Sequence, residues 1–302
     1  MQEKNVFQYL KEVYKSAGLV GKLITINLIV FLSIGIIGVA EFLFKSTGIT
    51  EKVVLSLAGP GNPEEILYKP WTLITQLFLH TSFFHFLFNM VMLFFAGRMF
   101  AQFFGEKRLL STYLIGGIFG YLTHVICYYS IPAFQDLGEN VVIGASGAIY
   151  ALLAAIAFHR PNLSVYLFGL LKMPIIVLVL FMLLVDFLSL GKADGIAHLV
   201  HLGGGVFGAL SIINVHSPGN FMNRFERFTS RIRLPKFSGK RKPKMKVYKQ
   251  KDVKQMDDDK YREVKKDHQE RIDAILDKIS KKGYEGLTKE EKEILFNESK
   301  RK

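Results

Sequence analysis

A serine and a histidine stand near the starts of two different apolar segments of this sequence. Ser146 lies in the run Gly144-Ala145-Ser146-Gly147, and His201 lies in the last long apolar segment. A hydroxyl and an imidazole are the minimal parts of a nucleophile and its general base. The pair therefore points to nucleophilic catalysis, provided that the fold brings the two side chains together.

The composition is that of a membrane protein with a polar tail. Half of the 302 residues are hydrophobic, and 26 of them are phenylalanine. Several apolar runs approach the roughly 20 residues that a helix needs to cross a bilayer. The single cysteine, Cys127, lies within one of these runs, which excludes an intramolecular disulfide and a thiolate metal site.

Six apolar runs predict an all-α membrane domain over residues 23–215. The second helix is expected to begin near Phe83, because Thr81-Ser82 can cap it, and to stop at Gly105. The segment 71–79 before it is expected to skim the membrane surface. The predicted helices are 23–44, 83–105, 109–129, 146–158, 172–190 and 197–215.

The basic residues predict the direction of each crossing. Lysines and arginines gather before the first run, between the second and third, between the fourth and fifth, and after the sixth. Basic residues favour the cytoplasmic side, so both termini are expected there. Helices two, four and six then run in the same direction, and Ser146 and His201 both lie near the outer face.

Small residues predict close packing between helices four and six. Gly147 begins a stripe of small residues on helix four, and Gly204 and Gly208 form one on helix six. Such stripes let helix backbones approach closely in lipid, and one stripe alone indicates only packing. Here each stripe begins beside a reactive residue, which predicts that Ser146 and His201 lie at the same depth.

Two polar residues on helix two are candidates for a functional role, because polar residues inside lipid are costly. His85 and Asn89 are four residues apart and share one helical face. Asn89 and the backbone N–H of Ser146 are suitable donors to a developing negative charge. The alternative for His85 and Asn89 is an interhelical hydrogen bond. On helix four, Tyr150 lies one turn after Ser146 and is expected to stack on the imidazole of His201.

Acidic and metal-ligating residues give weaker evidence, both for a third catalytic residue and for a metal site. Asp194 belongs to an outer loop and Asp186 to the end of helix five, so neither is expected to orient His201, and a dyad is favoured over a triad. Histidines alone could suggest zinc, but no acid or cysteine accompanies them at ligand spacing, so no metal is expected. The histidines considered are His80, His85, His198 and His201.

These residues together resemble the rhomboid family of intramembrane serine proteases over about residues 20–215. The resemblance implies a six-helix rhomboid-like bundle in which Ser146 is the nucleophile and His201 the general base. It also implies that His85, Asn89 and the Ser146 N–H form the oxyanion site. Two departures, Thr72 and Gln102, concern stability and substrate presentation. The matching motifs are Gly144-x-Ser146-Gly147 with Tyr150, His201-x-x-Gly204-x-x-x-Gly208, and His80-x-x-x-x-His85-x-x-x-Asn89.

The remaining segments flank this domain. Residues 1–22 predict a cytoplasmic amphipathic segment, with a frayed arm as the alternative. In the linker 216–257, the stretch 224–254 carries thirteen Lys and Arg residues against two acids, which favours an anionic lipid surface over nucleic acid. Residues 258–302 predict a helical hairpin with a capping box at Thr288-x-x-Glu291. The hairpin resembles a tail module of bacterial rhomboid-like proteins, and it could bind a partner or form an oligomer.

The sequence thus predicts a serine endopeptidase of the bacterial inner membrane that needs no ATP, metal or cofactor. Its expected substrates are single-pass membrane proteins, which the family resemblance implies are cut near the outer end of their helices. One alternative is a rhomboid-like scaffold that binds transmembrane helices without cutting them. A channel or transporter is disfavoured, because the sequence lacks an inverted repeat and its polar cluster lies at one face.

Overall fold

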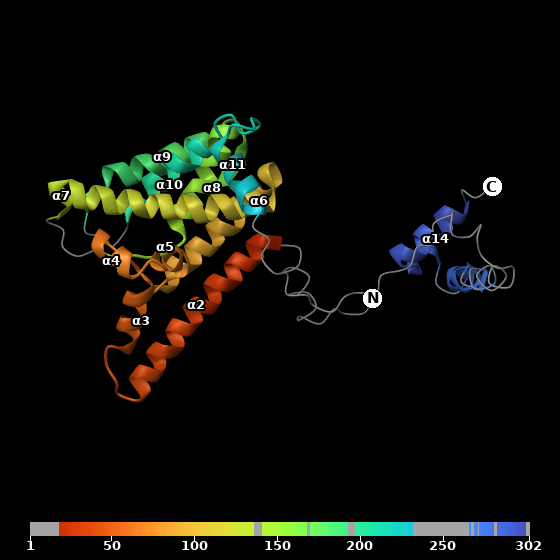
Figure 1. Ribbon diagram of the computed structural model, residues 1–302, viewed down its shortest axis with the longest axis horizontal. Coiled ribbons are helices and arrows are strands. Elements are labelled where there is room, and N and C mark those ends of the chain that lie inside the picture. The colour runs from red at the N-terminus through yellow and green to blue at the C-terminus, as the bar shows by residue number, and fades with distance from the viewer. Residues whose placement is uncertain are drawn as a thin grey trace. The chain divides into compact units, whose positions relative to one another are not determined.

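The computed structural model describes residues 18–135, 141–167, 170–192, 197–231, 266, 269–270, 272–280 and 283–299. The chain divides into two compact units, Met1–Arg233 and Leu234–Lys302, and each is described by itself. The first unit is mainly helical (Figure 1). Its elements are α2 (Gly18–Leu43), α3 (Ile49–Leu57), β1 (Gly59–Pro60), α4 (Pro63–Tyr68), α5 (Thr72–Thr75), η1 (Gln76–Phe78), α6 (Phe83–Ser130), α7 (Pro132–Gln135), β2 (Val141–Val142), α8 (Ser146–His159), β3 (Ser164–Leu167), β4 (Leu171–Pro174), α9 (Ile175–Leu188), α10 (His198–Ser211) and α11 (Phe221–Arg231).

Helix α2 begins earlier than the sequence predicts. Its first residue is Gly18 rather than Leu23, so residues 18–22 belong to the first helix and not to a separate surface segment. The helix extends because Val20 is buried against the core and because the N–H of Leu19 donates to Glu106 Oε1 at 2.9 Å. The predicted amphipathic character of residues 1–17 lies outside the described residues.

Helix α6 contains two helical segments separated at Gly105. This glycine has φ +80° and ψ 163°, a conformation that interrupts a helix and that only glycine adopts easily. The two segments run in different directions (Figure 1). The predicted start at Phe83 and the predicted break at Gly105 are therefore confirmed. Ser82 is the N-cap residue, but its side chain forms no capping hydrogen bond.

The prediction of a purely helical domain misses a short hairpin before α9. Residues 172–174 belong to β4, which pairs antiparallel with β3, and α9 starts only at Ile175 and ends at Leu188. Pro174 explains the difference, because proline disfavours helical backbone at the residue before it. A second small pairing joins β1 to β2.

Other boundaries also differ from the prediction. The segment 71–79 contains two short helical turns, α5 and η1, in which Thr72 and Gln76 are buried. Helix α10 ends at Ser211 rather than residue 215, and Asn214 beyond it has a positive φ of 50°. The predicted linker 216–257 contains the helix α11 at residues 221–231, and its residues 232–257 lie outside the described residues.

Helices α6, α8 and α10 form the centre of the first unit. Their backbones meet at glycines: a Cβ atom added to Gly204 or Gly208 on α10 would overlap the carbonyl oxygen of Gly147 or Ala151 on α8. A Cβ on Gly120 of α6 would overlap the carbonyl oxygen of Val200. Van der Waals contact at backbone distance therefore fixes how α8 and α10 lie against each other.

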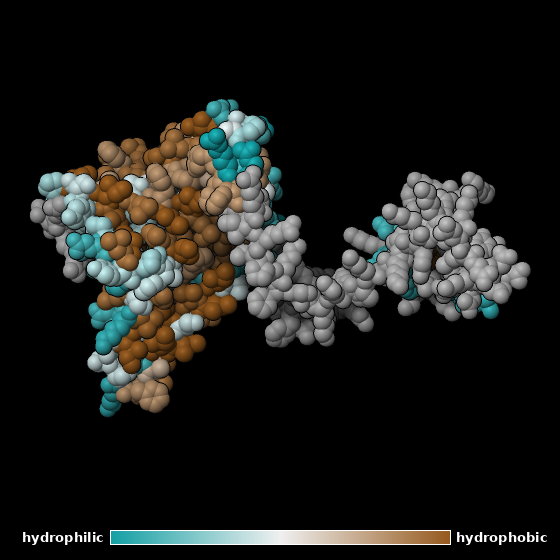
Figure 2. All heavy atoms as spheres, in the orientation of Figure 1, coloured by the Kyte–Doolittle hydropathy of each residue, from teal (hydrophilic) through white to brown (hydrophobic). Residues whose placement is uncertain are grey.

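Large apolar side chains are exposed on many helices of this unit. Figure 2 shows continuous hydrophobic surface over its helices, and large side chains such as Phe88 of α6 and Phe181 of α9 are more than 60% exposed. Helices α2 and α6 are long and apolar enough to cross a membrane, and α8 and α9 are shorter apolar helices of 14 residues each. Apolar surface of this extent fits contact with lipid.

The second unit contains the predicted capping box. Helix α14 (Lys289–Ser299) follows η2 (Tyr284–Gly286) and the helical residues 272–280. The Glu291 N–H donates to Thr288 Oγ1 at 3.3 Å, and the Thr288 N–H donates to Glu291 Oε2 at 2.7 Å. This reciprocal pair confirms the helix start that the sequence predicts.

Candidate active site

Ser146 and His201 lie in direct contact. Ser146 is the first residue of α8, and His201 is in the first turn of α10. The Nε2 atom of His201 lies 2.8 Å from Ser146 Oγ, which is hydrogen-bond distance. The contact follows from the packing beside it, where Gly147, the residue after Ser146, and Gly204, one turn after His201, bring the two helix backbones together.

Asp186 is the site residue that the sequence analysis missed. Its Oδ1 atom lies 2.8 Å from Nδ1 of His201 and 2.7 Å from Nδ1 of His198. The expectation that no acid orients His201 is therefore wrong. Asp186 lies in the last turn of α9 and is 4% exposed, and α9 packs beside α10. One signal was available: Asp186 is the sole charged residue of the α9 sequence, and a charge within an apolar helix usually has a partner.

Tyr150 covers one face of the His201 ring. The two ring centroids are 4.4 Å apart and the planes are inclined by 7°. Offset or parallel stacking of this kind restricts rotation of the imidazole. The contact is the one that the sequence predicts, and its contribution to the reaction remains a prediction.

The turn before Ser146 rests on two histidines. Gly144 has φ +110°, and a Cβ atom there would lie 2.8 Å from Cε1 of His85. The Ala145 N–H donates to Nε2 of His80 at 3.4 Å, and the His80 side chain is fully buried. Gly144 is thus required both by its left-handed backbone and by the ring beside it. His80 supports this turn, a role that the sequence analysis did not assign.

Asn89 is bound to its own helix in this structure. Its Nδ2 atom donates to the carbonyl oxygen of His85 at 2.8 Å, and the residue is 6% exposed. This bond uses one of the two amide hydrogens, so the side chain retains a donor. The backbone N–H groups at the start of α8, beginning with Ser146, have no partner within their own helix. An oxyanion role for these donors remains a prediction.

Three of these residues could also hold a metal ion. Asp186, His198 and His201 each offer one ligand atom, and these atoms lie within 4.8 Å of one another. No metal was expected because no acid accompanies the histidines at ligand spacing in the sequence, and Asp186 supplies such an acid from another helix. Two imidazoles and one carboxylate are a donor set that suits Zn²⁺ or other divalent transition metals.

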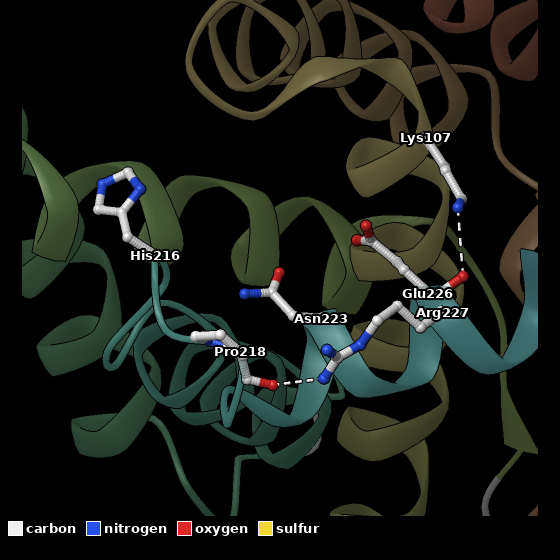
Figure 3. A pocket seen from close by; sticks show the side chains of 6 residues that line it. All are labelled: Lys107, His216, Pro218, Asn223, Glu226 and Arg227. Carbon is white, nitrogen blue, oxygen red and sulfur yellow. Dashed lines mark hydrogen bonds between the residues drawn. The ribbon is translucent and has the colours of Figure 1, made fainter.

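A separate cavity of about 340 Å³ lies at the opposite end of α10 from His201. It contains none of the predicted site residues (Figure 3). Nearby, the buried Arg108 of α6 donates to the Ser211 carbonyl oxygen and to Asn220 Oδ1, which ties α6 to the end of α10. The lining residues are Lys107, His216, Pro218, Asn223, Glu226 and Arg227.

Comparison with known proteins identifies the family. The Rhomboid domain model matches residues 68–218, half of the chain, and a family of unknown function, DUF6576, matches residues 257–301. Rhomboid protease GlpG of Haemophilus influenzae is 31% identical over 130 residues, 43% of this chain and 61% of that protein. Putative rhomboid protease YdcA of Bacillus subtilis is 33% identical over 146 residues, 45% and 63% of the two chains. RHOMBOID-like protein 12, mitochondrial, of Arabidopsis thaliana is 30% identical over 150 residues, 46% and 45%.

Each matched region spans less than two thirds of these relatives. The Rhomboid match nevertheless includes every residue of the candidate site, from His80 to His201, together with the helices that position them. The apolar exterior and the helical architecture agree with it. This chain is a multi-pass, all-α membrane protein of the rhomboid family.

Proposed function

We propose that this protein is an intramembrane serine endopeptidase in which Ser146 is the nucleophile and His201 the general base. The 2.8 Å approach of His201 Nε2 to Ser146 Oγ supports this function most directly. Two of the relatives are named rhomboid proteases, which supports the same chemistry. The substrates are peptide bonds in or near the transmembrane helices of single-pass membrane proteins.

The reaction begins with attack of Ser146 Oγ on the scissile carbonyl carbon, while His201 Nε2 takes the hydroxyl proton. The carbonyl oxygen becomes an oxyanion, for which the Ser146 N–H, Asn89 and His85 are the candidate donors. The C–N bond then breaks and His201 returns its proton to the leaving amine. Water, deprotonated by His201, hydrolyses the acyl-enzyme and regenerates the free hydroxyl.

The proposed topology has six crossings with both termini in the cytoplasm of a bacterium. Six helical segments are available for it: α2, the two parts of α6, α8, α9 and α10. Helices of 14 residues are about 21 Å long, so α8 to α10 would lie within a locally thin membrane region. Ser146 and His201 then lie near the outer face.

The segments outside the membrane domain have proposed roles as well. The basic stretch 224–254 would lie on an anionic lipid surface, and α11 at its start carries Arg224 and Arg227 among exposed phenylalanines. The hairpin 258–302 would bind a partner or a second copy. Of the basic stretch, residues 232–254 lie outside the described residues.

The test uses the full chain in liposomes with a transmembrane substrate. Ser146→Ala and His201→Ala should each abolish cleavage and leave the melting temperature nearly unchanged. Ser33→Ala, which removes an exposed hydroxyl from α2, should cleave at the normal rate. A fluorophosphonate probe should label Ser146 in the unaltered protein. Undiminished cleavage by Ser146→Ala would favour the alternative, a scaffold that binds helices without cutting them.

A further inference from the structure

We infer that Asp186 is a positioning residue for the reaction, which extends the dyad to a Ser146–His201–Asp186 relay across three helices. This inference rests on the proposed protease function. Two hydrogen bonds join the three side chains in sequence: Asp186 Oδ1 to His201 Nδ1 at 2.8 Å, and His201 Nε2 to Ser146 Oγ at 2.8 Å. The residues come from α9, α10 and α8 respectively.

The Asp186 carboxylate fixes which ring nitrogen of His201 carries the proton. An ionised carboxylate only accepts hydrogen bonds, so His201 Nδ1 must be the protonated nitrogen. Its Nε2 atom then has a free lone pair directed at the Ser146 hydroxyl, which is the form a general base needs. Without Asp186, the neutral imidazole can place its proton on Nε2 and lose the ability to accept the serine proton.

His198 holds the carboxylate in place. Its Nδ1 atom lies 2.7 Å from the same Oδ1 atom of Asp186, and the two imidazole planes are inclined by 88°. One turn of α10 thus presents two imidazoles to one carboxylate oxygen. Because Tyr150 stacks on His201, the ring is restrained on its face as well as at Nδ1. These contacts fix the imidazole before a substrate arrives.

The position of Asp186 favours a role in the reaction over one in helix stability. It is 4% exposed, and it is the one charged residue in an apolar helix whose large side chains are otherwise exposed or packed in the core. A charge in such a helix is costly, and its structural benefit is small unless the partners need it. An apolar residue of the same size would pack α9 against α10 at lower cost.

The test compares kcat and KM for a transmembrane substrate in liposomes, with EDTA present throughout so that metal binding at these residues plays no part. Asp186→Asn should lower kcat at least about 100-fold and change KM by less than about threefold. The contacts with the substrate remain, but the His201 ring is no longer held with its proton on Nδ1. Asp186→Leu is nearly isosteric and should lose as much kcat while keeping or raising the melting temperature.

Two controls separate this role from a structural one. Ser189→Ala removes another buried polar group from the same end of α9, one that contacts Lys192 and not His201, and should keep kcat within about threefold of the unaltered protein. In a His198→Gln background, Asp186→Asn should still lower kcat at least about tenfold, because its contact with His201 is independent.

The outcomes distinguish this inference from the proposed function. If Ser146→Ala abolishes cleavage but Asp186→Asn and Asp186→Leu cleave the substrate at the normal rate, the positioning role is wrong and the proposed protease function is still supported. The positioning role is also wrong if Ser189→Ala loses as much kcat as Asp186→Asn. If Ser146→Ala itself cleaves normally, the proposed protease function is wrong, and the positioning role that rests on it is wrong as well.

Discussion

The backbone of α10 at Gly204 lies directly against the carbonyl group of Gly147 on α8. A Cβ atom on Gly204 would stand 2.9 Å from the Gly147 carbonyl carbon and still closer to its oxygen. Backbone atoms cannot rotate away as a side chain can, so the distance between the two helices is fixed at this point. Ser146 immediately precedes Gly147, and His201 lies one turn before Gly204, so the same contact sets the separation of the two reactive side chains.

Replacing Gly204 should therefore damage the site as well as the fold. We expect Gly204→Ala to lower cleavage at least about tenfold, because α10 must move away from α8 and carry His201 with it. Helix propensity alone would favour alanine by about 1 kcal/mol, so any loss of stability measures the clash. Gly35→Ala on α2, where a Cβ meets nothing within 4 Å, is the matched control and should raise or preserve the melting temperature. A fully active Gly204→Ala would contradict this account.

Asn89 and Asn27 provide a matched test of the oxyanion role. Both are buried, and each donates from Nδ2 to the carbonyl oxygen four residues earlier, at 2.8 and 2.9 Å. Removing either should lower thermal stability to a similar degree. Only Asn89→Ala should also lower kcat, by about 100-fold, because Asn89 lies one turn from His85, whose ring lies beside Gly144. Equal activity losses in the two variants would support a packing role for Asn89.

Metal removal should leave cleavage unchanged. The proposed steps use only the Ser146 hydroxyl and the His201 imidazole, although Asp186, His198 and His201 have the donor set for a divalent metal. We expect the same kcat after dialysis against EDTA and after adding back Zn²⁺ at a stoichiometric amount. A loss of activity on chelation that Zn²⁺ restores would show that the metal, and not the relay of hydrogen bonds, prepares the site.

The second unit should lose stability in acid. The pKa of Glu291 is lowered by the side-chain hydrogen bond from Lys278 and by the backbone N–H of Thr288. A lowered folded-state pKa stabilises the fold above the unfolded pKa, and this contribution disappears as the pH falls through the folded pKa. We expect NMR shifts of Ile294 in the full chain to report loss of helix α14 on acidification. In Glu291→Gln this carboxyl contribution is absent, so an identical acid transition there would contradict the prediction.

Much of the membrane unit could be predicted from local sequence. The starts of α6 and α8 and the break at Gly105 were indicated by the residues next to them, as was the capping box at Thr288 in the second unit. The pairing of helices four and six could be inferred because small residues and reactive residues recur together on both. Each of these features is encoded within one or two turns of helix.

Features that depend on distant segments could not be predicted. Asp186 meets His201 because the end of α9 packs on the start of α10. The lone charge of Asp186 in an apolar helix indicates that it has a partner, but not which residue that partner is. The hairpin of β3 and β4 was missed since apolar residues before Pro174 suit a helix and a strand equally. The early start of α2 depends on Glu106, far along the chain.

The three residues of the proposed relay belong to three separate helices, which pack against one another through different kinds of contact. Helices α8 and α10 meet through glycine backbones, whereas α9 touches α10 through side chains such as Leu183 against Gly205. A sideways displacement of α9 alone would withdraw the Asp186 carboxylate while leaving Ser146 and His201 in contact. If the proposed relay operates, a ligand that displaced α9 would lower activity without occupying Ser146.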